Sequence, residues 1–411
     1  MKIIQRRILQ VYYQVSITCI QQGISLPRWQ HVTTAMIKKD PNISKINKLR
    51  VIHLYEADYN LILKIPLVWN AHDHNMLNDG QAGSRPGCNA IDILILKEMK
   101  YLYARLTKTN LATMDNDAKS CYDRIICNLA MIISRTYGMS SRACRLQGTT
   151  LRKMQFRLRT AIGDSNSTYS HSEATPIHGT GQGSCASPAL WLLISSILMD
   201  CLSELAGGMT MQDVNANTSL KEWINGFVDD TSLFCNIHGN NIDELRKQLH
   251  HDMIIWQELL EASGGKLELS KCFYYILSWK FNDDGEAIPM RIEEQLEQTT
   301  PISITTNHSE VIIQQKQPTD SHKTLGCLKT MNGDESDEVK YLTSKSTNYL
   351  RILKNSQLSR LQARLAYNCI FIPSLRYGLP SFSLTKNEID SIQKPAIEQF
   401  IRVIGYENGF P

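Results

Sequence analysis

The sequence predicts an α+β fold with two or three subdomains, because its 411 residues exceed what one compact core usually spans. Two strand-like runs, 223–226 and 231–234, flank an acidic doublet and predict a β-hairpin. Long helical patterns cover residues 90–106, 189–205 and 241–262. A hairpin combined with long helices elsewhere in the chain favours the α+β class.

Composition places the chain among folded proteins. Hydrophobic residues make up 42% of it and charged residues 20%, unlike a disordered chain. No run approaches the roughly 18 apolar residues of a membrane span, and polar residues interrupt the basic N-terminus too early for a secretory signal. Eleven cysteines with no Cys-x-x-Cys pair favour reduced thiols over disulfides or a zinc finger. We therefore expect a protein that is neither secreted nor bound to a membrane.

The first elements follow from periodicity and helix breakers. Residues 1–30 predict a helix, and strand-like runs follow at 31–38 and 49–54. Residues 56–78 have a helical pattern that Pro66 interrupts.

The later elements are predicted in the same way. The 90–106 helix carries its apolar stripe on Ile91, Leu94, Ile95 and Met99. The other elements are expected in this order: a buried strand over 110–114, a helix from 122, a two-faced strand over 154–159, a helix capped by Ser187, strands over 266–277, a polar peripheral hairpin or loop insertion over 281–320, a buried strand over 322–327 and helices from 337 to the end.

The acidic doublet Asp229-Asp230 lies at the tip of the predicted hairpin. Burying two adjacent carboxylates costs free energy unless a cation neutralises them. Carboxylate oxygens suit hard divalent ions, above all Mg²⁺. Many hairpins turn on Asp for conformational reasons alone, so the doublet by itself leaves both interpretations open.

A second acidic feature follows the 110–114 strand. Asp117 lies where this strand gives way to a helix, and Asp123 lies in the first turn of that helix, where an acid complements the helix N-terminus. A strand-end acid that points into a cleft needs a partner. Asp115 would share a strand face with Asp117, so a role in metal binding stays open for it.

Two glycine-rich loops and a basic stretch point to a phosphate-bearing partner. Arg85 is central in QAGSRPGC, and a loop Arg beside glycines suits bidentate phosphate binding, although an ordinary surface turn is the alternative. The loop at 178–188 offers backbone N–H groups before a helix but lacks P-loop spacing. Residues 141–163 carry six basic residues and no acidic one, a pattern that a solvated helix face also explains. The net charge of +4 hints at a polyanionic partner.

Taken in order, these stretches form a recognisable set: QAGSRPG, DAKSCYD, GTGQGSCASP, FVDD, GGKLELSKC and HKTLGC. Together they resemble a reverse transcriptase of the non-long-terminal-repeat retrotransposon and group II intron type. The resemblance covers nearly the whole chain and implies a right-hand polymerase with an antiparallel palm sheet backed by helices, fingers and a partial helical thumb. Val228 departs from the Ala or Met that the family more often has before the acid pair.

The resemblance implies a role for particular residues. Asp117, Asp229 and Asp230 would be the catalytic, metal-binding carboxylates, and Lys271 the lysine near the leaving pyrophosphate. Tyr122 would be the aromatic gate that excludes a 2′-hydroxyl. The other implied positions are Arg85, Lys38, Lys39, Arg50, Gln182 and Gly183 for the nucleotide, and Leu325 and Gly326 for the primer grip. The basic Arg152, Lys153, Arg157 and Arg159 would follow the nucleic-acid backbone.

The resemblance also implies a division of the chain. The expected parts are fingers over 1–110, palm over 111–136, a basic fingers or palm region over 137–176, palm over 177–281, a peripheral insertion over 282–320, a primer-grip strand over 321–332 and a helical thumb or connection over 333–411. Because the last residues carry no terminal signal, we expect the chain to be part of a longer protein.

The expected activity is synthesis of DNA on RNA, and on DNA templates too, for a retroelement. The expected partners are an RNA template, a DNA primer, dNTPs and two Mg²⁺ ions, or Mn²⁺ in their place. An RNA-dependent RNA polymerase shares this palm chemistry, but Tyr122 argues against it. A domesticated or decayed copy that only binds RNA is the other alternative, and the three intact acids argue against it. The family and the free cysteines place the protein in the nucleus or cytoplasm; the oligomeric state stays open.

Overall fold

A five-stranded sheet forms the centre of the computed structural model, which describes residues 2–38, 42, 45, 49–63, 67–119, 121–172, 178–237, 239, 241–296, 301–305 and 310–403. The strand order is β15-β10-β3-β9-β8. The strands are β3 (Asn110–Asp117), β8 (Ile224–Phe227), β9 (Asp230–Ile237), β10 (Phe273–Leu277) and β15 (Gln314–Lys316). Neighbouring strands are antiparallel except β15, which is parallel to β10. This mixture of sheet and helices agrees with the predicted α+β class.

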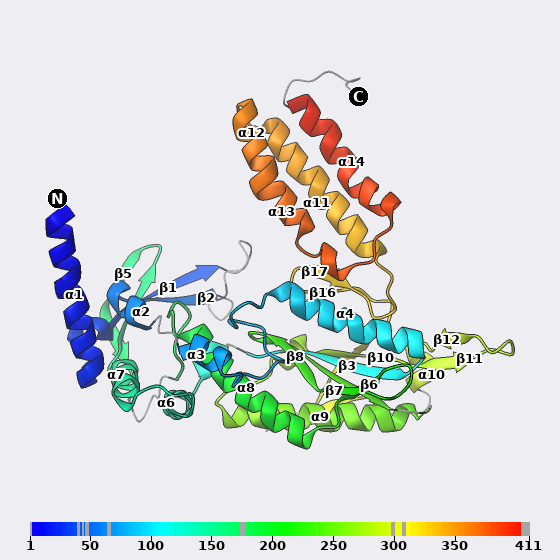
Figure 1. Ribbon diagram of the computed structural model, residues 1–411, viewed down its shortest axis with the longest axis horizontal. Helices are drawn as coiled ribbons and strands as arrows, with labels where there is room; N and C mark the ends of the chain where they lie inside the picture. Colours follow the sequence, from blue (N-terminus) through cyan, green and yellow to red (C-terminus); the bar gives the residue numbers. More distant parts are fainter. Residues whose placement is uncertain are drawn as a thin grey trace.

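Helices cover both faces of the central sheet. In Figure 1, α8 (Ser187–Leu205) and α9 (Ile242–Ala262) lie below it, and α4 (Ala90–Thr107) crosses above it. The middle strand β3 is therefore enclosed on both sides, and its first five residues are all buried. A strand buried on both faces needs mainly apolar residues, and Leu111, Ala112 and Met114 supply them before the two acids.

Helix α8 is long and apolar enough to span a membrane by length and composition, with a mean hydropathy of 1.4. Ser195 and Ser196 interrupt the apolar residues of this helix, so the sequence contains no unbroken run of the length that a membrane span needs. Of this stretch, 56% is buried inside the fold, as in the core helix of a globular domain. Ser187 is not its N-cap as predicted: the cap position is Ala186, and the Ser187 hydroxyl donates to the backbone oxygens of Thr180 and Gly181 instead.

Helix α4 differs from its prediction in the face that it buries. Its start is set by a capping box between Asn89 and Asp92. Met99, in the predicted stripe, is 57% exposed, whereas Lys97 and Lys100 are buried. The stripe is rotated because both lysines have partners beneath the helix, which hydrophobicity alone does not reveal.

The N-terminal part of the chain forms a second unit around a four-stranded sheet of order β2-β1-β4-β5, with β1 and β4 parallel (Figure 1). Its elements are α1 (Lys2–Gln22), η1 (Pro27–Gln30), β1 (His31–Lys38), β2 (Leu49–Leu54), α2 (Ala57–Leu63), α3 (Leu67–Asp73), α6 (Cys127–Thr136), α7 (Ser141–Arg152), β4 (Gln155–Thr160) and β5 (Gly163–Ser170). The alternation predicted for β4 is confirmed: Phe156 is buried, and Arg157 and Arg159 are exposed.

The helix predicted from residue 122 is divided into α5 (Cys121–Arg124) and α6. In one continuous helix the Ile126 N–H would donate to the Tyr122 oxygen. Instead Ile126 donates to the Ser263 oxygen, and the Tyr122 oxygen accepts from Thr180. The break therefore ties the glycine-rich loop and the end of α9 to the segment after β3.

Short hairpins extend from the central sheet. They are β6 (Met209–Gln212) with β7 (Ser219–Glu222), β11 (Trp279–Phe281) with β12 (Ala287–Pro289), β13 (Ser303–Thr305) with β14 (Glu310–Ile312), and β16 (His322–Thr324) with β17 (Cys327–Lys329). Two short helices, η3 (Leu269–Lys271) and α10 (Ile292–Leu296), lie between strands. The segment predicted to be peripheral ends in β15, which is an edge strand of the central sheet, so its last part is not peripheral.

The C-terminal helices form a bundle with a core of their own. They are α11 (Ser336–Asn355), α12 (Arg360–Ala366), η4 (Tyr367–Phe371), α13 (Ile372–Arg376), η5 (Leu379–Ser381) and α14 (Lys386–Val403). Leu342, Leu350, Phe371, Leu375 and Ile392 are buried in one cluster, separate from the core of the sheet.

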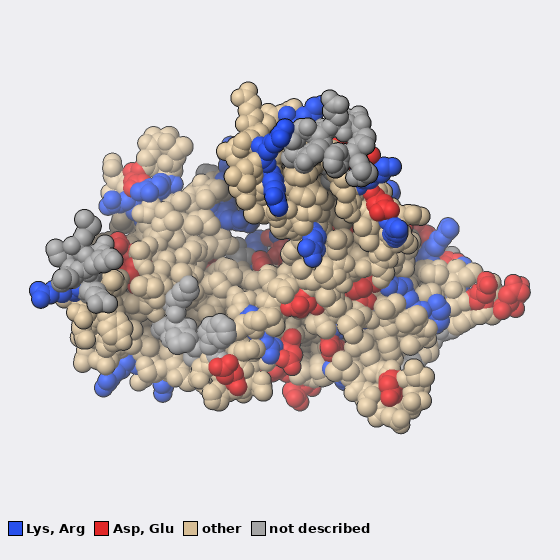
Figure 2. Space-filling view, turned by 45° about the horizontal axis from the view of Figure 1, so that its top comes forward, with Lys and Arg blue, Asp and Glu red and all other residues tan. Residues whose placement is uncertain are grey.

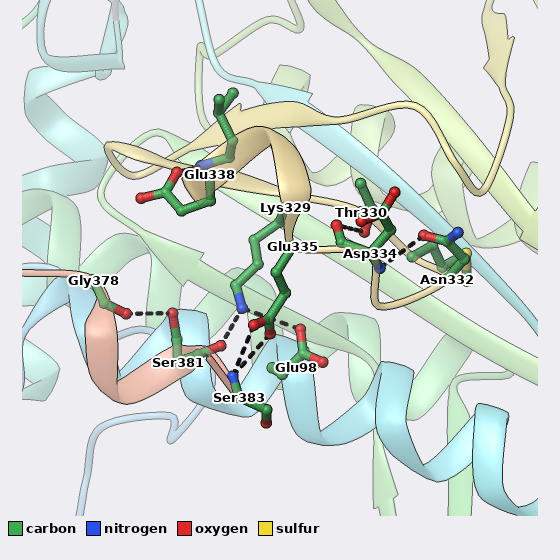
Figure 3. A network of polar contacts seen from close by, with 12 residues as sticks. Glu98, Lys329, Thr330, Asn332, Asp334, Glu335, Glu338, Gly378, Ser381 and Ser383 are labelled. Atoms are coloured by element: carbon green, nitrogen blue, oxygen red, sulfur yellow. Dashed lines mark hydrogen bonds and ion pairs between the residues drawn. The ribbon is translucent and has the colours of Figure 1, made fainter. Parts of the chain in front are cut away.

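A polar network joins this bundle to α4 (Figure 3). Lys329 pairs with Glu98 at 3.2 Å and donates to the Ser381 oxygen. Glu98 also pairs with Arg105 at 2.6 Å, and the Ser383 N–H donates to the Glu335 carboxylate. Burial lowers the pKa of Lys329. The attachment therefore depends on a buried cation whose acid partner comes from another unit.

We predict that Glu98→Ala weakens this attachment more than Lys329→Met. Removing Glu98 leaves Lys329, which is 6% exposed, as a buried cation without its acid, at a cost of about 2–3 kcal/mol. Lys329→Met removes that cation and leaves Glu98 paired with Arg105, at about 1 kcal/mol. Urea unfolding of both variants measures the difference, and an equal or reversed order would contradict the network's role.

Candidate active site

Three carboxylates come together where β3 and β9 begin to separate. The register of these strands places Asp117 opposite Asp230. The backbone N–H of Ala118 donates to the backbone oxygen of Asp229 at 3.1 Å. Val228 and Asp229 form the two-residue turn between β8 and β9, since Phe227 pairs with Asp230. The strand that ends in Asp117 therefore lies beside the acidic hairpin, as a site shared by Asp117, Asp229 and Asp230 requires.

Burial and the neighbouring negative charges raise the pKa values of Asp229 and Asp230. Burial, and then the charge of Asp117, raise the pKa of Asp229. The protein packed around the Asp230 carboxyl, and then the charges of Asp229, Asp117 and Asp115, raise its pKa to about 6, although the residue is open to solvent on one side. Such a cluster carries more negative charge than its surroundings neutralise, so a cation would stabilise it.

Lys271 is the cation that contacts the cluster. It is the last residue of η3 and forms an ion pair with Asp117. The hydrogen bond within this pair raises the pKa of Lys271. Among the residues that the structure describes, no three Asp, Glu, His or Cys side chains are arranged to hold a metal ion as they stand. The all-oxygen donor set suits a hard divalent ion, but Lys271 would have to leave Asp117 for an ion to bind there.

The extra acid Asp115 is already neutralised. Its Oδ1 lies 2.5 Å from Lys97 Nζ on α4 and accepts from the Ser232 hydroxyl at 2.5 Å. The neighbouring Lys100 pairs with Glu222 and donates to Asn225 at 2.5 Å. Asp115 thus holds α4 to the sheet, and its metal-binding role, left open by the sequence, is not favoured by these contacts.

Tyr122 and the glycine-rich loop form the wall beside Asp229. Burial, and then the charges of Cys121 and Asp229, raise the pKa of Tyr122, so its hydroxyl stays protonated near the turn. The backbone N–H of Gln182 donates to the Asp123 carboxylate. The backbone oxygen of Gln182 accepts from the backbone N–H of His53 at 2.6 Å. A Cβ on Gly183 would lie 2.2 Å from the His53 oxygen, so this glycine is needed for the loop to pack on β2.

The structure brings only some of the predicted basic nucleotide contacts toward this wall. Arg50 on β2 is exposed, and its charge lowers the pKa of Asp229. Lys38 is exposed at the end of β1, and Lys39 lies outside the described residues. Arg85 is turned into its own loop, where it donates to the Asn78 oxygen at 2.9 Å and pairs with Asp79 at 2.6 Å. As it lies, Arg85 is a loop contact and does not present its guanidinium to the carboxylates.

The predicted nucleic-acid contacts lie on two different units. Arg152, Lys153 and Arg157 are exposed on α7 and β4, whereas Arg159 is held by Asp164 through two hydrogen bonds of 2.6 and 2.8 Å. Figure 2 shows that the surface is hollowed between the N-terminal unit and the C-terminal helices, and that acidic and basic side chains meet there.

Leu325 and Gly326 form a turn rather than the predicted strand. Both have positive φ, 47° and 93°, as a tight two-residue hairpin of type I′ requires. The Leu325 oxygen accepts from Tyr377 of α13 at 3.0 Å. Leu325 also lines a cavity of about 330 Å³ together with Asp117, Asp230 and Lys271, so this turn faces the acidic cluster.

Sequence reasoning missed the residues that hold the acidic turn. Gln81 hydrogen-bonds both the N–H and the oxygen of Val228, and Trp191 donates to the same oxygen. No local pattern around Gln81 signals a contact with a residue so distant in the chain. Lys97 and Lys100 did carry a signal, because two lysines on the buried face of a helix require acidic partners.

No protein-family model and no curated protein matches the chain. Among solved structures, telomerase from Candida albicans and from Candida tropicalis, each in complex with a TWJ fragment of telomeric RNA, overlaps 97% of this chain at 14% identity, with TM-scores of 0.43 and 0.42. Apo telomerase from C. tropicalis, truncated from its C-terminal domain, overlaps 70% at 12% identity and a TM-score of 0.41. The chain spans 63%, 63% and 54% of these telomerase chains. At TM-scores below 0.5 the overlap carries no functional argument.

We predict that His53 makes the packing of the glycine-rich loop (178–188) on β2 sensitive to acid. Burial lowers the pKa of His53 to about 4, below the value near 6.5 of the unfolded chain. The unfolded state therefore binds the proton more readily, and stability is lost as pH falls from about 6.5 to 4. Urea unfolding at pH 7 and pH 5 should show a loss of stability that His53→Phe reduces by about 1–2 kcal/mol; the rest of the loss is expected from His322, because burial lowers its pKa to about 4 as well. The exposed His251→Gln should keep the loss; a loss that His53→Phe leaves intact would contradict this assignment.

Proposed function

We propose that the chain is an RNA-directed DNA polymerase, which adds deoxynucleotides to a primer 3′-hydroxyl. The observation that carries this proposal is the register of β3 and β9, which gathers Asp117, Asp229 and Asp230 from distant segments. Phosphoryl transfer asks a protein mainly to position the reactants and to neutralise charge. A cluster of carboxylates set beside a cavity, in which burial and then the neighbouring charges raise the pKa of Asp230, is suited to that chemistry.

The carboxylates would hold two Mg²⁺ ions, or Mn²⁺. When bound, such ions activate the attacking hydroxyl and stabilise the departing pyrophosphate. The chain's own contribution is to present oxygen ligands from two backbone segments that are hydrogen-bonded to each other. Lys271, once released from Asp117, would be free to neutralise the leaving pyrophosphate.

Some of the other implied site residues would contact the incoming nucleotide, and the rest would contact the nucleic acid. Tyr122 would lie under the sugar and exclude a 2′-hydroxyl, with Gln182 and Gly183 under the base pair. Arg50 and Lys38 would hold the triphosphate; Arg85 would have to leave Asp79 to reach a phosphate.

The units take the places of a right hand in this proposal. The N-terminal unit would be the fingers, the central sheet the palm and the C-terminal bundle the thumb. The exposed Arg152, Lys153 and Arg157 would follow the RNA template, and the turn at Leu325 and Gly326 would contact the DNA primer. A retroelement, acting in the nucleus or cytoplasm, is the setting that this activity would have.

We predict that Asp229→Asn abolishes most nucleotide addition. Loss of one charge from the cluster should lower primer extension on an RNA template by about 10²–10³-fold. The exposed Asp284→Asn, in the β11–β12 hairpin, serves as the matched control and should match wild type. Equal extension by Asp229→Asn and wild type would refute the metal site, and no extension by any variant would favour a chain that only binds RNA.

We predict that Tyr122→Ala relaxes the choice of sugar. Removing the ring should lower discrimination against ribonucleotides by roughly 10–200-fold, the range for one apolar contact in a pocket. Tyr122→Phe keeps the ring and should keep the discrimination. Steady-state incorporation of dNTPs and NTPs measures both. If wild type takes ribonucleotides as readily as deoxynucleotides, the chain is an RNA polymerase instead.

A further inference from the structure

The turn that carries the acid pair has an unfavourable backbone conformation. Val228 has φ of 62°, in the left-handed region. Among the described non-glycine residues with positive φ it is the one with a β-branched side chain. A two-residue turn with positive φ at its first position is typical of type II′, which favours glycine there. A Cβ in this region is costly, and a β-branched residue makes the conformation a true outlier.

One buried side chain holds this turn on both sides of the strained residue. Gln81 is fully buried, and its Nε2 donates to the Val228 oxygen at 3.2 Å while its Oε1 accepts from the Val228 N–H at 3.0 Å. The rest of the amide is satisfied by Ser195 Oγ at 3.2 Å and the Gly83 N–H at 2.9 Å. All four hydrogen-bonding positions of the amide are thus used.

The backbone around Gln81 is fixed to the same hairpin. The Ala82 N–H donates to the Gly226 oxygen at 2.9 Å, and the Gly226 N–H donates to the Gly80 oxygen at 2.7 Å. A Cβ on Gly83 would lie 2.3 Å from the Val228 nitrogen, so only glycine allows this approach. The loop therefore lies along the edge strand β8 as an added parallel bridge, and the Gln81 side chain reaches the turn from a fixed base.

We propose that Gln81 is a positioning residue: it holds the Val228 peptide in the left-handed conformation and so sets the direction of Asp229 and Asp230. This inference rests on the proposed function, since it concerns the same acid pair. Strain that is held by surrounding contacts restricts a turn to one conformation, whereas glycine at this position would leave the turn free to change. Trp191, which donates to the Val228 oxygen at 2.6 Å, supports the same peptide from α8.

The test combines Gln81→Met with Val228→Gly. Gln81→Met keeps the length of the side chain and removes its hydrogen bonds. It should lower the maximal rate of primer extension by about 10²-fold, with the KM for dNTP changed less than about 3-fold, because the reacting geometry and not nucleotide binding is lost. In the Val228→Gly background, Gln81→Met should lower the maximal rate by a factor that is about 5–30 times smaller. This difference corresponds to the strain that glycine relieves.

Two further readouts do not depend on turnover. Hydrogen exchange in metal-free protein should show faster exchange at residues 227–231 in Gln81→Met, with the rest of the central sheet unchanged. Titration with Mn²⁺ alone should show weaker binding, by about 10-fold, since the carboxylates are no longer aimed together.

Gln295→Met is the matched control, because Gln295 is also fully buried in a set of hydrogen bonds, with Ile276, Ser278, Met290 and Gln315. Gln295→Met should leave hydrogen exchange at 227–231 unchanged. Its effect should also be the same with and without Val228→Gly, which means no coupling between the two changes. Equal effects of the two Gln→Met changes, without coupling, would overturn the proposal. Faster exchange in Gln81→Met, with coupling to Val228→Gly, in a protein that never extends a primer would support the positioning role and refute the polymerase.

Discussion

The antiparallel pairing of β3 with β9 determines where every acid of the site lies. Because side chains alternate along a strand, a slip of one residue in this register would move Asp117 to the opposite face and separate it from Asp230. The register is secured by the buried residues of β3, which are enclosed between α4 and α9. It is also secured beyond the strand by the hydrogen bond from Ala118 to Asp229. The core thus specifies the geometry of the candidate site as well as the stability of the sheet.

The central sheet and the β6–β7 hairpin carry several negative charges, and lysines from other elements pair with three of them. Lys97 neutralises Asp115, Lys100 neutralises Glu222, and Lys271 contacts Asp117. The first two lysines are buried, so these pairs are built into the fold. Lys271 is 62% exposed and comes from a short 3₁₀ helix, so its pair is the one that can open at low cost. Asp229 and Asp230 keep raised pKa values, by burial first and then by the neighbouring carboxylates.

Local patterns predicted the parts of the fold that local sequence controls. The acidic hairpin, the buried start of β3 and the helix over 242–262 were all evident from runs and breakers. The short polar strand β15 had no such signal, because its place in the sheet is fixed by β10 and not by its own residues. The reach of Gln81 to Val228 could not be predicted either, since it depends on how distant segments pack. The turn at Leu325 was mistaken for a strand because a leucine gives no sign of positive φ.

The claim that the acid cluster is a metal site is tested most directly by anomalous X-ray scattering from crystals of this protein grown with Mn²⁺. We expect an anomalous peak in contact with carboxylate oxygens of both Asp117 and Asp229, with the Lys271 ammonium moved away from Asp117. Asp115 should stay paired with Lys97, because that pair belongs to the packing of α4. Saturating Mn²⁺ with no peak between Asp117 and Asp229, and with Lys271 still on Asp117, would contradict a metal site at this cluster.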